Sequence, residues 1–283
     1  MIPRILIIAG SDSGGGAGIQ ADIKTVTMLG GHPMTAITAI TAQNTRGVQG
    51  VHPVPTDMVI AQIASVASDI GIDAVKIGMI GSAETAHAVA DALQAFDVPI
   101  VFDPVMVATS GSILADAATI AAFARLMRIA SVVTPNIPEL EALSGERSPT
   151  EADAITWAAD LARSTGTAVL AKGGHRSPEM TGQVMEAAGT TGGNLIADNL
   201  VLPNGQDFVW THPWIDTKHT HGTGCTLASG IACGLAVGMS LPDAVGRAIA
   251  FVQAALASAP GIGAGHGPMG HALGRIPFDR CRG

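Results

Sequence analysis

The stretch that decides the fold of this chain is Arg4-Ile-Leu-Ile-Ile-Ala-Gly-Ser-Asp-Ser-Gly-Gly-Gly-Ala-Gly-Ile-Gln-Ala-Asp22. The apolar run over residues 5–9 is typical of a buried strand. A glycine-rich turn follows, and an amphipathic stretch then continues to about Leu29. A buried strand that leads through such a turn into a helix is the opening unit of a parallel α/β sheet.

The same alternation continues along the rest of the chain. Further strands are predicted over residues 34–40, 74–77, 100–102, 132–134 and 168–171, and helices around residues 58–68, 84–94, 117–127, 152–164, 226–237 and 242–258. Continuous apolar strands separated by helices imply a mainly parallel sheet that is covered on both faces. We therefore predict an α/β fold in a single domain, 1–283, with a loop and β-hairpin insertion over 182–216 and a C-terminal loop and tail over 260–283.

Composition excludes several classes of protein. Hydrophobic residues make up 47% of the 283 residues and charged residues 13%, which is ample material for a large core. Aromatic residues reach only 3% and the net charge is −8, so a nucleic-acid partner is disfavoured. Three cysteines without a Cys-x-x-Cys pair predict neither a disulfide framework nor a zinc site. The first apolar run is too short for a signal peptide or a membrane span, so we expect a cytoplasmic protein without a membrane partner.

Polar residues that directly follow the predicted strands are the candidate site, because ligands of open parallel sheets bind beyond the carboxyl ends of the strands. These segments are Gly10-Ser-Asp12, Lys76-Ile-Gly-Met79, Asp103-Pro-Val-Met106, Thr134-Pro-Asn136 and Lys172-Gly-Gly-His175.

The first glycine-rich turn has two competing interpretations. Gly16-x-Gly18-x-x-Ala21 formally matches the dinucleotide fingerprint, which would indicate a nucleotide-linked dehydrogenase. That fingerprint expects an acidic residue after the second strand, and the second strand ends at Thr41 without one. We favour the other interpretation, in which the glycines let the backbone approach a ligand and Asp22 offers a hydrogen-bond acceptor.

The most specific segment is Thr217-Lys-His-Thr-His-Gly-Thr-Gly-Cys-Thr226, which leads directly into an Ala/Gly-rich helix. Glycines at a helix N-terminus expose unpaired N–H groups, and the helix dipole adds positive charge. Such a turn suits a phosphoryl group in a negatively charged transition state. We expect the same field to lower the pKa of the Cys225 thiol, which could then accept a proton from a substrate hydroxyl.

Two further segments indicate a metal and phosphate region. Asn136-x-x-Glu139 follows a strand, and Asp103 ends another, so these carboxylates are suitable donors for Mg²⁺. Helix capping would also explain the Asn-x-x-Glu spacing. Lys172, beside two glycines, could bring its ammonium group to a phosphate. The nine histidines show no metal-ligand spacing, and we assign no role to His175, His219, His221 or His271.

Seven segments in order make the chain resemble the ribokinase-like kinases, and within them the hydroxymethylpyrimidine/phosphomethylpyrimidine kinases of thiamine biosynthesis. They are Ala9-Gly-Ser-Asp-Ser-Gly-Gly-Gly-Ala-Gly-Ile-Gln-Ala-Asp22, Ala42-Gln-Asn-Thr-Arg-Gly47, Lys76-Ile-Gly-Met79, Phe102-Asp-Pro-Val-Met106, Thr134-Pro-Asn-Ile-Pro-Glu139, Lys172-Gly-Gly-His175 and Thr217-Lys-His-Thr-His-Gly-Thr-Gly-Cys225. The resemblance implies a ribokinase-like three-layer sandwich, with a mainly parallel central sheet flanked by helices, that forms a homodimer. It implies an ATP- and Mg²⁺-dependent kinase that phosphorylates 4-amino-5-hydroxymethyl-2-methylpyrimidine and then its monophosphate.

The resemblance also implies roles for individual residues. Residues holding the pyrimidine would be Gln43 and the backbone near Gly10, Ala17, Met79 and Val105, with Asp22 nearby. Asp103 and Glu139 would serve the magnesium, Asn136, Lys172 and Thr223 the nucleotide, and Gly222, Thr223 and Gly224 the anion hole beside Cys225 as catalytic base. A glutamine suits this place because its amide both donates to and accepts from an aminopyrimidine edge.

The sequence departs from the wider class at the base. Most ribokinase-like kinases have an aspartate where this chain has Cys225, and a cysteine there characterises the pyrimidine kinases and a related group of pyridoxal kinases. A pyridoxal/pyridoxine kinase is therefore the alternative function. A non-catalytic pyrimidine-binding protein is disfavoured, because a sensor needs no proton acceptor. Residues 182–216 are longer than the usual hairpin of the family, and Thr41 and His219 differ from its usual residues.

Overall fold

The computed structural model describes residues 2–108, 111–145, 151–174 and 195–275. Within these ranges a nine-stranded sheet has the order β3-β2-β1-β4-β5-β6-β7-β8-β9. The strands are β1 (Arg4–Asp12), β2 (His32–Asn44), β3 (Gly47–Pro53), β4 (Ala74–Ile77), β5 (Ile100–Phe102), β6 (Val132–Val133), β7 (Ala168–Ala171), β8 (Leu195–Val201) and β9 (Asp207–Pro213). The six central strands, β2, β1, β4, β5, β6 and β7, are parallel to one another. At one edge β3 runs antiparallel to β2, and at the other β8 runs antiparallel to β7 and β9 to β8.

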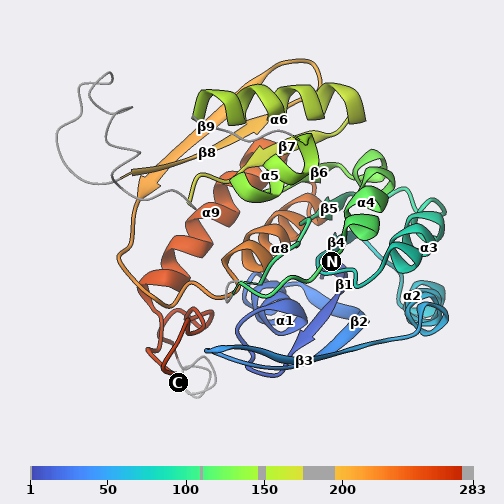
Figure 1. Cartoon of the computed structure of the whole chain (residues 1–283), viewed down its shortest axis with the longest axis horizontal. Coiled ribbons are helices and arrows are strands. Elements are labelled where there is room, and N and C mark those ends of the chain that lie inside the picture. The colour runs from blue at the N-terminus through green and yellow to red at the C-terminus, as the bar shows by residue number, and fades with distance from the viewer. Residues whose placement is uncertain (1, 109–110, 146–150, 175–194, 276–283) are drawn as a thin grey trace.

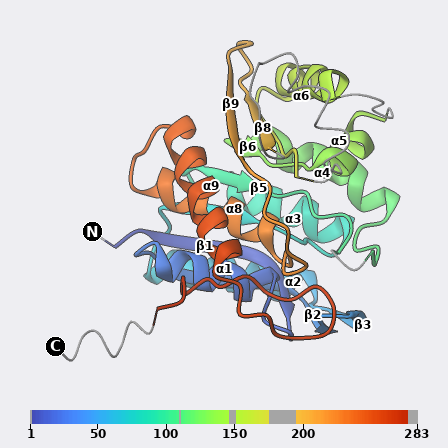
Figure 2. The same ribbon diagram turned by 90° about the vertical axis from the view of Figure 1, so that its left-hand side faces the viewer.

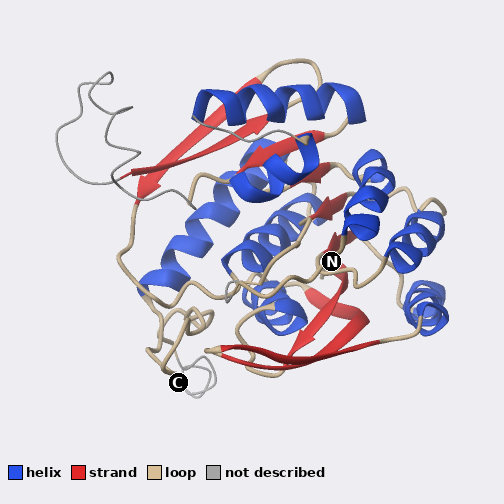
Figure 3. Cartoon of the chain, in the orientation of Figure 1, coloured by secondary structure: helices blue, strands red, loops and turns tan. Residues whose placement is uncertain are grey.

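Helices cover both faces of the sheet, as Figures 1 and 3 show. On one face lie α1 (Gly18–Met28), α8 (Thr223–Ala236) and α9 (Leu241–Ala257); on the other lie α2 (Thr56–Asp69), α3 (Ala83–Leu93), α4 (Ala117–Ile129), α5 (Ile137–Ser144) and α6 (Glu151–Thr165). Side chains alternate along β1, so that Ile5 and Ile7 pack in the core under α1, α8 and α9. Leu6 and Ile8 pack in the core on the opposite face of the sheet, under α2, α3 and α4. The predicted three-layer α/β sandwich is thereby confirmed.

Most predicted elements agree with the structure. β4, β5 and β7 begin and end where the apolar runs do. β3 was not predicted, because it is an exposed edge strand without apolar alternation. The predicted hairpin is present as β8 and β9, while residues 182–194 lie outside the described residues. The single-domain organisation stays a prediction.

The order of the strands creates one reversal point. From β1 the chain first moves outward to β2 and β3, and then returns to β4 on the opposite side of β1. Loops that leave neighbouring parallel strands in opposite directions open a crevice at the carboxyl ends of the strands. The loop after α9 passes the tip of the β2–β3 hairpin, where the Gly265 amide donates to Thr45 Oγ1 over 3.3 Å (Figure 2).

No helix within the described ranges combines the length and the apolarity that crossing a bilayer requires.

Candidate active site

A cleft of about 950 Å³ lies at the carboxyl ends of the parallel strands. It brings together thirteen of the fourteen predicted site residues, which are Gly10, Ala17, Gln43, Met79, Asp103, Val105, Asn136, Glu139, Lys172, Gly222, Thr223, Gly224 and Cys225. They come from both termini and from the middle of the sequence. The structure therefore supports the rule that polar residues after parallel strands converge on one place.

The start of α8 forms one wall of this cleft. Gly222 is its N-cap and has φ 88°, a left-handed conformation that favours glycine. A Cβ at position 222 would also lie 2.0 Å from the Gly16 carbonyl oxygen, so only glycine fits between the two glycine-rich turns. A Cβ on Gly224 would lie 3.2 Å from Lys172 Nζ and 3.3 Å from Asp103 Oδ2. The first turn of α8 thus faces the charged residues of the cleft.

Those charged residues form a compact group that we call the phosphate-end cluster: Asp103, Glu139 and Lys172. Lys172 Nζ donates to Asp103 Oδ1 over 2.9 Å and lies 3.8 Å from Glu139 Oε2. Thr134 Oγ1 donates to Asp103 Oδ1 over 2.9 Å. Burial acts to raise the pKa of Asp103, but Lys172 and then Lys76 outweigh it, and the pKa is lowered.

Glu139 is the titratable member of the cluster. Burial raises its pKa to about 7, Lys172 opposes the rise and Asp103 adds to it. Asn136 and Glu139 also form a capping box at the start of α5, in which each side chain accepts from the other's backbone amide over 2.8 Å. Helix capping therefore does explain this spacing. The capping carboxylate still lies beside Lys172, so both interpretations hold for the same residue.

The phosphate-end cluster suits a hard cation. Its donors are carboxylate oxygens, and Asp103 Oδ2 lies on the side of α8. Within the described residues no group of three or more His, Cys, Asp and Glu side chains could hold a metal by itself. Mg²⁺ needs only one or two carboxylates because it retains water and takes further oxygens from phosphates. The donor set therefore fits Mg²⁺ bound together with a nucleotide.

Cys225 lies partly buried in the first turn of α8, at the place that was predicted. The prediction that the helix terminus lowers its pKa is wrong for this structure. Burial raises the pKa of the thiol to about 11, Lys76 lowers it, and Asp22 and Asp103 raise it further. Cys233, deeper in α8, is buried away from the cleft, and Cys281 lies outside the described residues.

Asp22 is the predicted site residue that does not line the cleft. Its side chain is fully buried, with Oδ2 at 2.9 Å from Lys76 Nζ and Oδ1 accepting from Ser229 Oγ over 2.8 Å. Ser229 is one turn after Cys225 on the same face of α8. Instead of the expected neighbour of the substrate, the structure shows an ion pair with Lys76 under that face.

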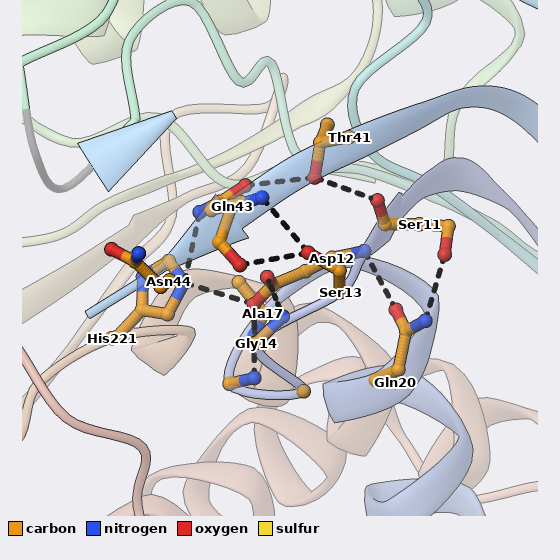
Figure 4. Close-up of polar contacts among 12 residues, drawn as sticks. Ser11, Asp12, Ser13, Gly14, Ala17, Gln20, Thr41, Gln43, Asn44 and His221 are labelled. Atoms are coloured by element: carbon orange, nitrogen blue, oxygen red, sulfur yellow. Dashed lines mark hydrogen bonds and ion pairs between the residues drawn. The ribbon is translucent and has the colours of Figure 1, made fainter. Parts of the chain in front are cut away.

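Sequence reasoning missed a polar network at the opposite end of the cleft. Asp12 Oδ1 accepts from the Gly14 amide over 2.7 Å, and Oδ2 accepts from the Gly16 and Ala17 amides over 2.9 and 2.8 Å (Figure 4). His221 Nε2 lies 3.0 Å from Asp12 Oδ2 and 3.1 Å from Gln43 Nε2. An aspartate just before a run of glycine amides was the available signal, because such side chains accept from the backbone of the following turn.

A second missed group lies behind Lys172. Asp198 Oδ1 accepts from the Gly173 amide over 2.9 Å, and His212 Nε2 lies 2.9 Å from Asp198 Oδ2. Gln253 Nε2 lies 2.9 Å from the other ring nitrogen of His212. These residues belong to β8, β9 and α9, so no local pattern connects them. They anchor the turn that carries Lys172.

The other histidines that the sequence left without a role do not change this description. His271 is buried beside Thr226, and burial lowers its pKa to about 4. His219 packs behind Gly267, and His175 lies outside the described residues.

The fold is that of the ribokinase-like kinases. A model of the family described as phosphomethylpyrimidine kinase matches residues 12–270. The chain belongs to the phosphomethylpyrimidine kinase family.

Two relatives illustrate the match in sequence. A hydroxymethylpyrimidine/phosphomethylpyrimidine kinase of Streptomyces coelicolor is 44% identical over 271 residues, which cover 95% of this chain and 94% of that protein. A thiamine biosynthesis bifunctional protein of Geobacter sulfurreducens is 44% identical over 273 residues, which cover 95% of this chain and 52% of that protein.

Two solved structures illustrate the match in fold. The pyridoxal kinase of Staphylococcus aureus in complex with AMP-PCP and pyridoxal has a TM-score of 0.82 and 31% identity, and the match covers 98% of this chain and 96% of that one. The phosphomethylpyrimidine kinase of Clostridium difficile has a TM-score of 0.71 and 34% identity, covering 89% of this chain and 98% of that one.

Proposed function

We propose that this chain transfers the γ-phosphoryl group of ATP to hydroxymethylpyrimidine and then to phosphomethylpyrimidine, in thiamine biosynthesis. The observation that carries the proposal is the position of Gly224, whose Cα faces both Lys172 and Asp103 at the start of α8. A helix N-terminus, an ammonium group and a carboxylate then meet in the cleft that also contains Gln43. Membership of the family supports the same activity.

The ring binds at the end of the cleft where β1 and β2 end. Gln43 contacts the polar edge of the ring, and the backbone near Gly10, Ala17, Met79 and Val105 encloses it. A Cβ on Gly10 would lie 2.2 Å from Met79 Cε, so the Met79 side chain packs closely on the backbone at Gly10. The hydroxymethyl group points toward Cys225.

The triphosphate lies along Lys172 and the start of α8. In the transition state the charge on the transferred group is spread over its equatorial oxygens, so catalysis consists of positioning and charge stabilisation. The backbone amides of the turn Gly222-Thr223-Gly224 hold that group, Lys172 neutralises charge, and Asn136 contacts the nucleotide. The acceptor oxygen attacks the γ-phosphorus in line, and the bond to the ADP oxygen breaks.

Mg²⁺ bound with ATP would be held by Asp103 and Glu139, where it would neutralise charge on the phosphates. The carboxylate of Glu139 is a donor only when ionised, and its pKa of about 7 places this change near neutral pH.

Cys225 accepts the proton of the substrate hydroxyl. Its thiol must first ionise, and the raised pKa opposes this. Since the negative charge of Asp103 contributes to the rise, a cation paired with Asp103 shifts Cys225 toward thiolate. The base is thus coupled electrostatically to the occupancy of the phosphate end.

Pyridoxal kinase activity is the second candidate. The observation that favours it is the close structural match to a pyridoxal kinase solved with pyridoxal. We also propose that the chain works as a cytoplasmic homodimer, which analytical ultracentrifugation of the purified chain would test.

The deciding experiment measures ATP consumption with the hydroxymethylpyrimidine, its monophosphate and pyridoxal, with mass detection of the products. We expect magnesium-dependent formation of the pyrimidine mono- and diphosphates, with kcat/KM for pyridoxal lower. Turnover of pyridoxal alone would replace the proposal by its alternative, and no turnover of any of the three would refute kinase activity.

A further inference from the structure

The side chain of Gln43 meets two partners at the ring end of the cleft (Figure 4). Its Nε2 lies 3.1 Å from His221 Nε2, and its Oε1 lies 3.2 Å from Thr41 Oγ1. Each partner has a second contact: His221 Nε2 is 3.0 Å from Asp12 Oδ2, and Thr41 Oγ1 is 2.9 Å from the Ser11 carbonyl oxygen. The protons available at these atoms decide which way the Gln43 amide faces.

His221 Nε2 is a proton donor. Burial acts to raise the pKa of Asp12, but hydrogen bonds from His221 and from the Ala17 and Gly14 amides outweigh it, so Asp12 is ionised and only accepts. A ring nitrogen without a proton would turn its lone pair toward that carboxylate, so Nε2 carries the proton. If the NH₂ group of Gln43 lay beside this nitrogen, two hydrogen-bond donors would face each other without an acceptor. The group there must therefore be the amide oxygen.

Thr41 leads to the same conclusion from the other side. Its hydroxyl has one proton, and the Ser11 carbonyl, which can only accept, takes it over 2.9 Å. Only lone pairs of Thr41 Oγ1 remain for Gln43, so the partner must be the amide NH₂. A half-turn of the amide, which exchanges its oxygen and nitrogen, removes both conflicts at once.

We infer that Asp12, His221 and Thr41 hold the Gln43 amide in this single orientation, and that the orientation selects rings with an amino group beside an unprotonated ring nitrogen. In this arrangement one lone pair of Gln43 Oε1 faces the single Nε2 proton of His221, which it shares with Asp12 Oδ2, and one proton of Gln43 Nε2 goes to Thr41 Oγ1. One lone pair and one proton are left for a ligand in the cleft that Gln43 lines.

A 4-aminopyrimidine offers the complement of these two groups. Its amino group donates to the amide oxygen and its N3 accepts from the amide nitrogen, as adenine does with glutamine. A 4-oxopyrimidine with a proton on N3 offers the reverse pattern. Its carbonyl oxygen would face the Gln43 amide oxygen, and its N3–H would face the Gln43 amide nitrogen, so neither pair could form a hydrogen bond. The inference rests on the proposed function in placing the pyrimidine at Gln43.

Calorimetric titration without nucleotide tests the inference separately from catalysis. The two ligands are 4-amino-5-hydroxymethyl-2-methylpyrimidine and its 4-oxo counterpart. We expect the native chain to prefer the amino ring by roughly 100-fold or more, because a mismatched ring leaves two polar groups unpaired. Thr41→Val removes the acceptor that holds the amide, and should reduce the preference to about 10-fold or less.

Two variants serve as controls. Thr41→Ser retains the hydroxyl and should keep the preference within about 3-fold of native. Thr167→Val removes another buried threonine hydroxyl, which donates to the Met127 carbonyl outside the lining of the cleft, and should leave the preference unchanged. If Thr41→Val does not fold, His221→Phe gives the second route, because it removes the donor to the amide oxygen and should also reduce the preference about 10-fold.

Three results would overturn the inference: equal affinity of the native chain for both rings, affinity for neither ring, or an unchanged preference in a folded Thr41→Val or His221→Phe variant. Selective binding of the amino ring by a chain that then transfers no phosphate would refute the proposed function and leave the inference standing.

Discussion

The two ends of the cleft differ in how their polar groups are balanced. At the ring end, the oxygens of the Asp12 carboxylate accept from three backbone amides and from His221. The Thr41 hydroxyl lies 2.9 Å from the Ser11 carbonyl oxygen, and the Nε2 proton of His221 lies between Asp12 and the Gln43 amide. Directional hydrogen bonds of this kind discriminate strongly between ligands, because the wrong partner leaves buried groups unpaired.

At the phosphate end, the balance is between charges. Asp103 and Glu139 share the single ammonium group of Lys172, which leaves excess negative charge when both carboxylates are ionised. Such a group is less selective in shape, but it responds strongly to an added cation and to pH. We propose that selection of the ring and transfer of the phosphate depend on these two physically separate groups of residues, and three variants test that separation.

Cys225→Ala should show the largest effect. Loss of a general base lowers kcat by roughly 10²- to 10⁴-fold. The affinity for the aminopyrimidine, measured by calorimetry, should stay within about 3-fold of native, since the alanine removes no hydrogen bond to the ring. Cys233→Ala, a buried cysteine in the same helix outside the cleft, is the matched control and should keep native kcat. Near-native turnover of Cys225→Ala would remove the thiol from the mechanism.

Lys172→Gln should come next. It keeps a donor for Asp103 but removes the positive charge, so kcat/KM for ATP should fall roughly 10²- to 10³-fold. The steady-state rate with varied ATP gives this value, and calorimetry with the aminopyrimidine gives the comparison. An equal loss of affinity for the ring would show that binding of the ring depends on the charged residues at the phosphate end.

Glu139→Gln should have the smallest of the three effects. The effect is measured as a change in how the unfolding free energy depends on pH. Burial raises the pKa of Glu139 from the usual 4.5 to about 7, so between these values the folded chain binds more protons than the unfolded chain. Glu139 therefore lowers the unfolding free energy progressively as pH rises from about 4.5 to about 7, at most about 1.4 kcal/mol per pH unit.

Urea unfolding at several pH values measures this contribution. The unfolding free energy of Glu139→Gln minus that of the native chain should increase across the window and then become constant. His271, whose lowered pKa gives the opposite slope, is present in both chains and cancels in the difference. A difference that does not change with pH would show that Glu139 is ionised throughout.

The sequence was sufficient wherever one local pattern determined the result. The apolar runs of β4, β5 and β7 are short, continuous and followed at once by polar residues, so both their limits and the position of the cleft could be predicted. β3 could not, because an edge strand exposed to solvent needs no apolar alternation.

Two side chains at the site have surroundings that no local pattern predicts. Asp22 pairs with Lys76, which is 54 residues away, and nothing near Asp22 in the sequence indicates this partner. The thiol of Cys225 was judged from its helix terminus alone, whereas burial and two carboxylates from other elements decide its pKa. Local patterns place a residue in space, and the charges that surround it come from distant segments.

The contact between the two glycine-rich turns has a consequence for the synthesis of the chain. Gly222 packs on the Gly16 carbonyl, and the His221 amide donates to the Gly267 carbonyl over 3.2 Å. The second turn follows the described strands in the sequence, because β9 ends at Pro213 and α8 begins at Thr223. During synthesis these strands are therefore made before the glycine-rich turn that packs on Gly16. Ligand binding at the contact between the two turns cannot assist folding before the start of α8 has been made.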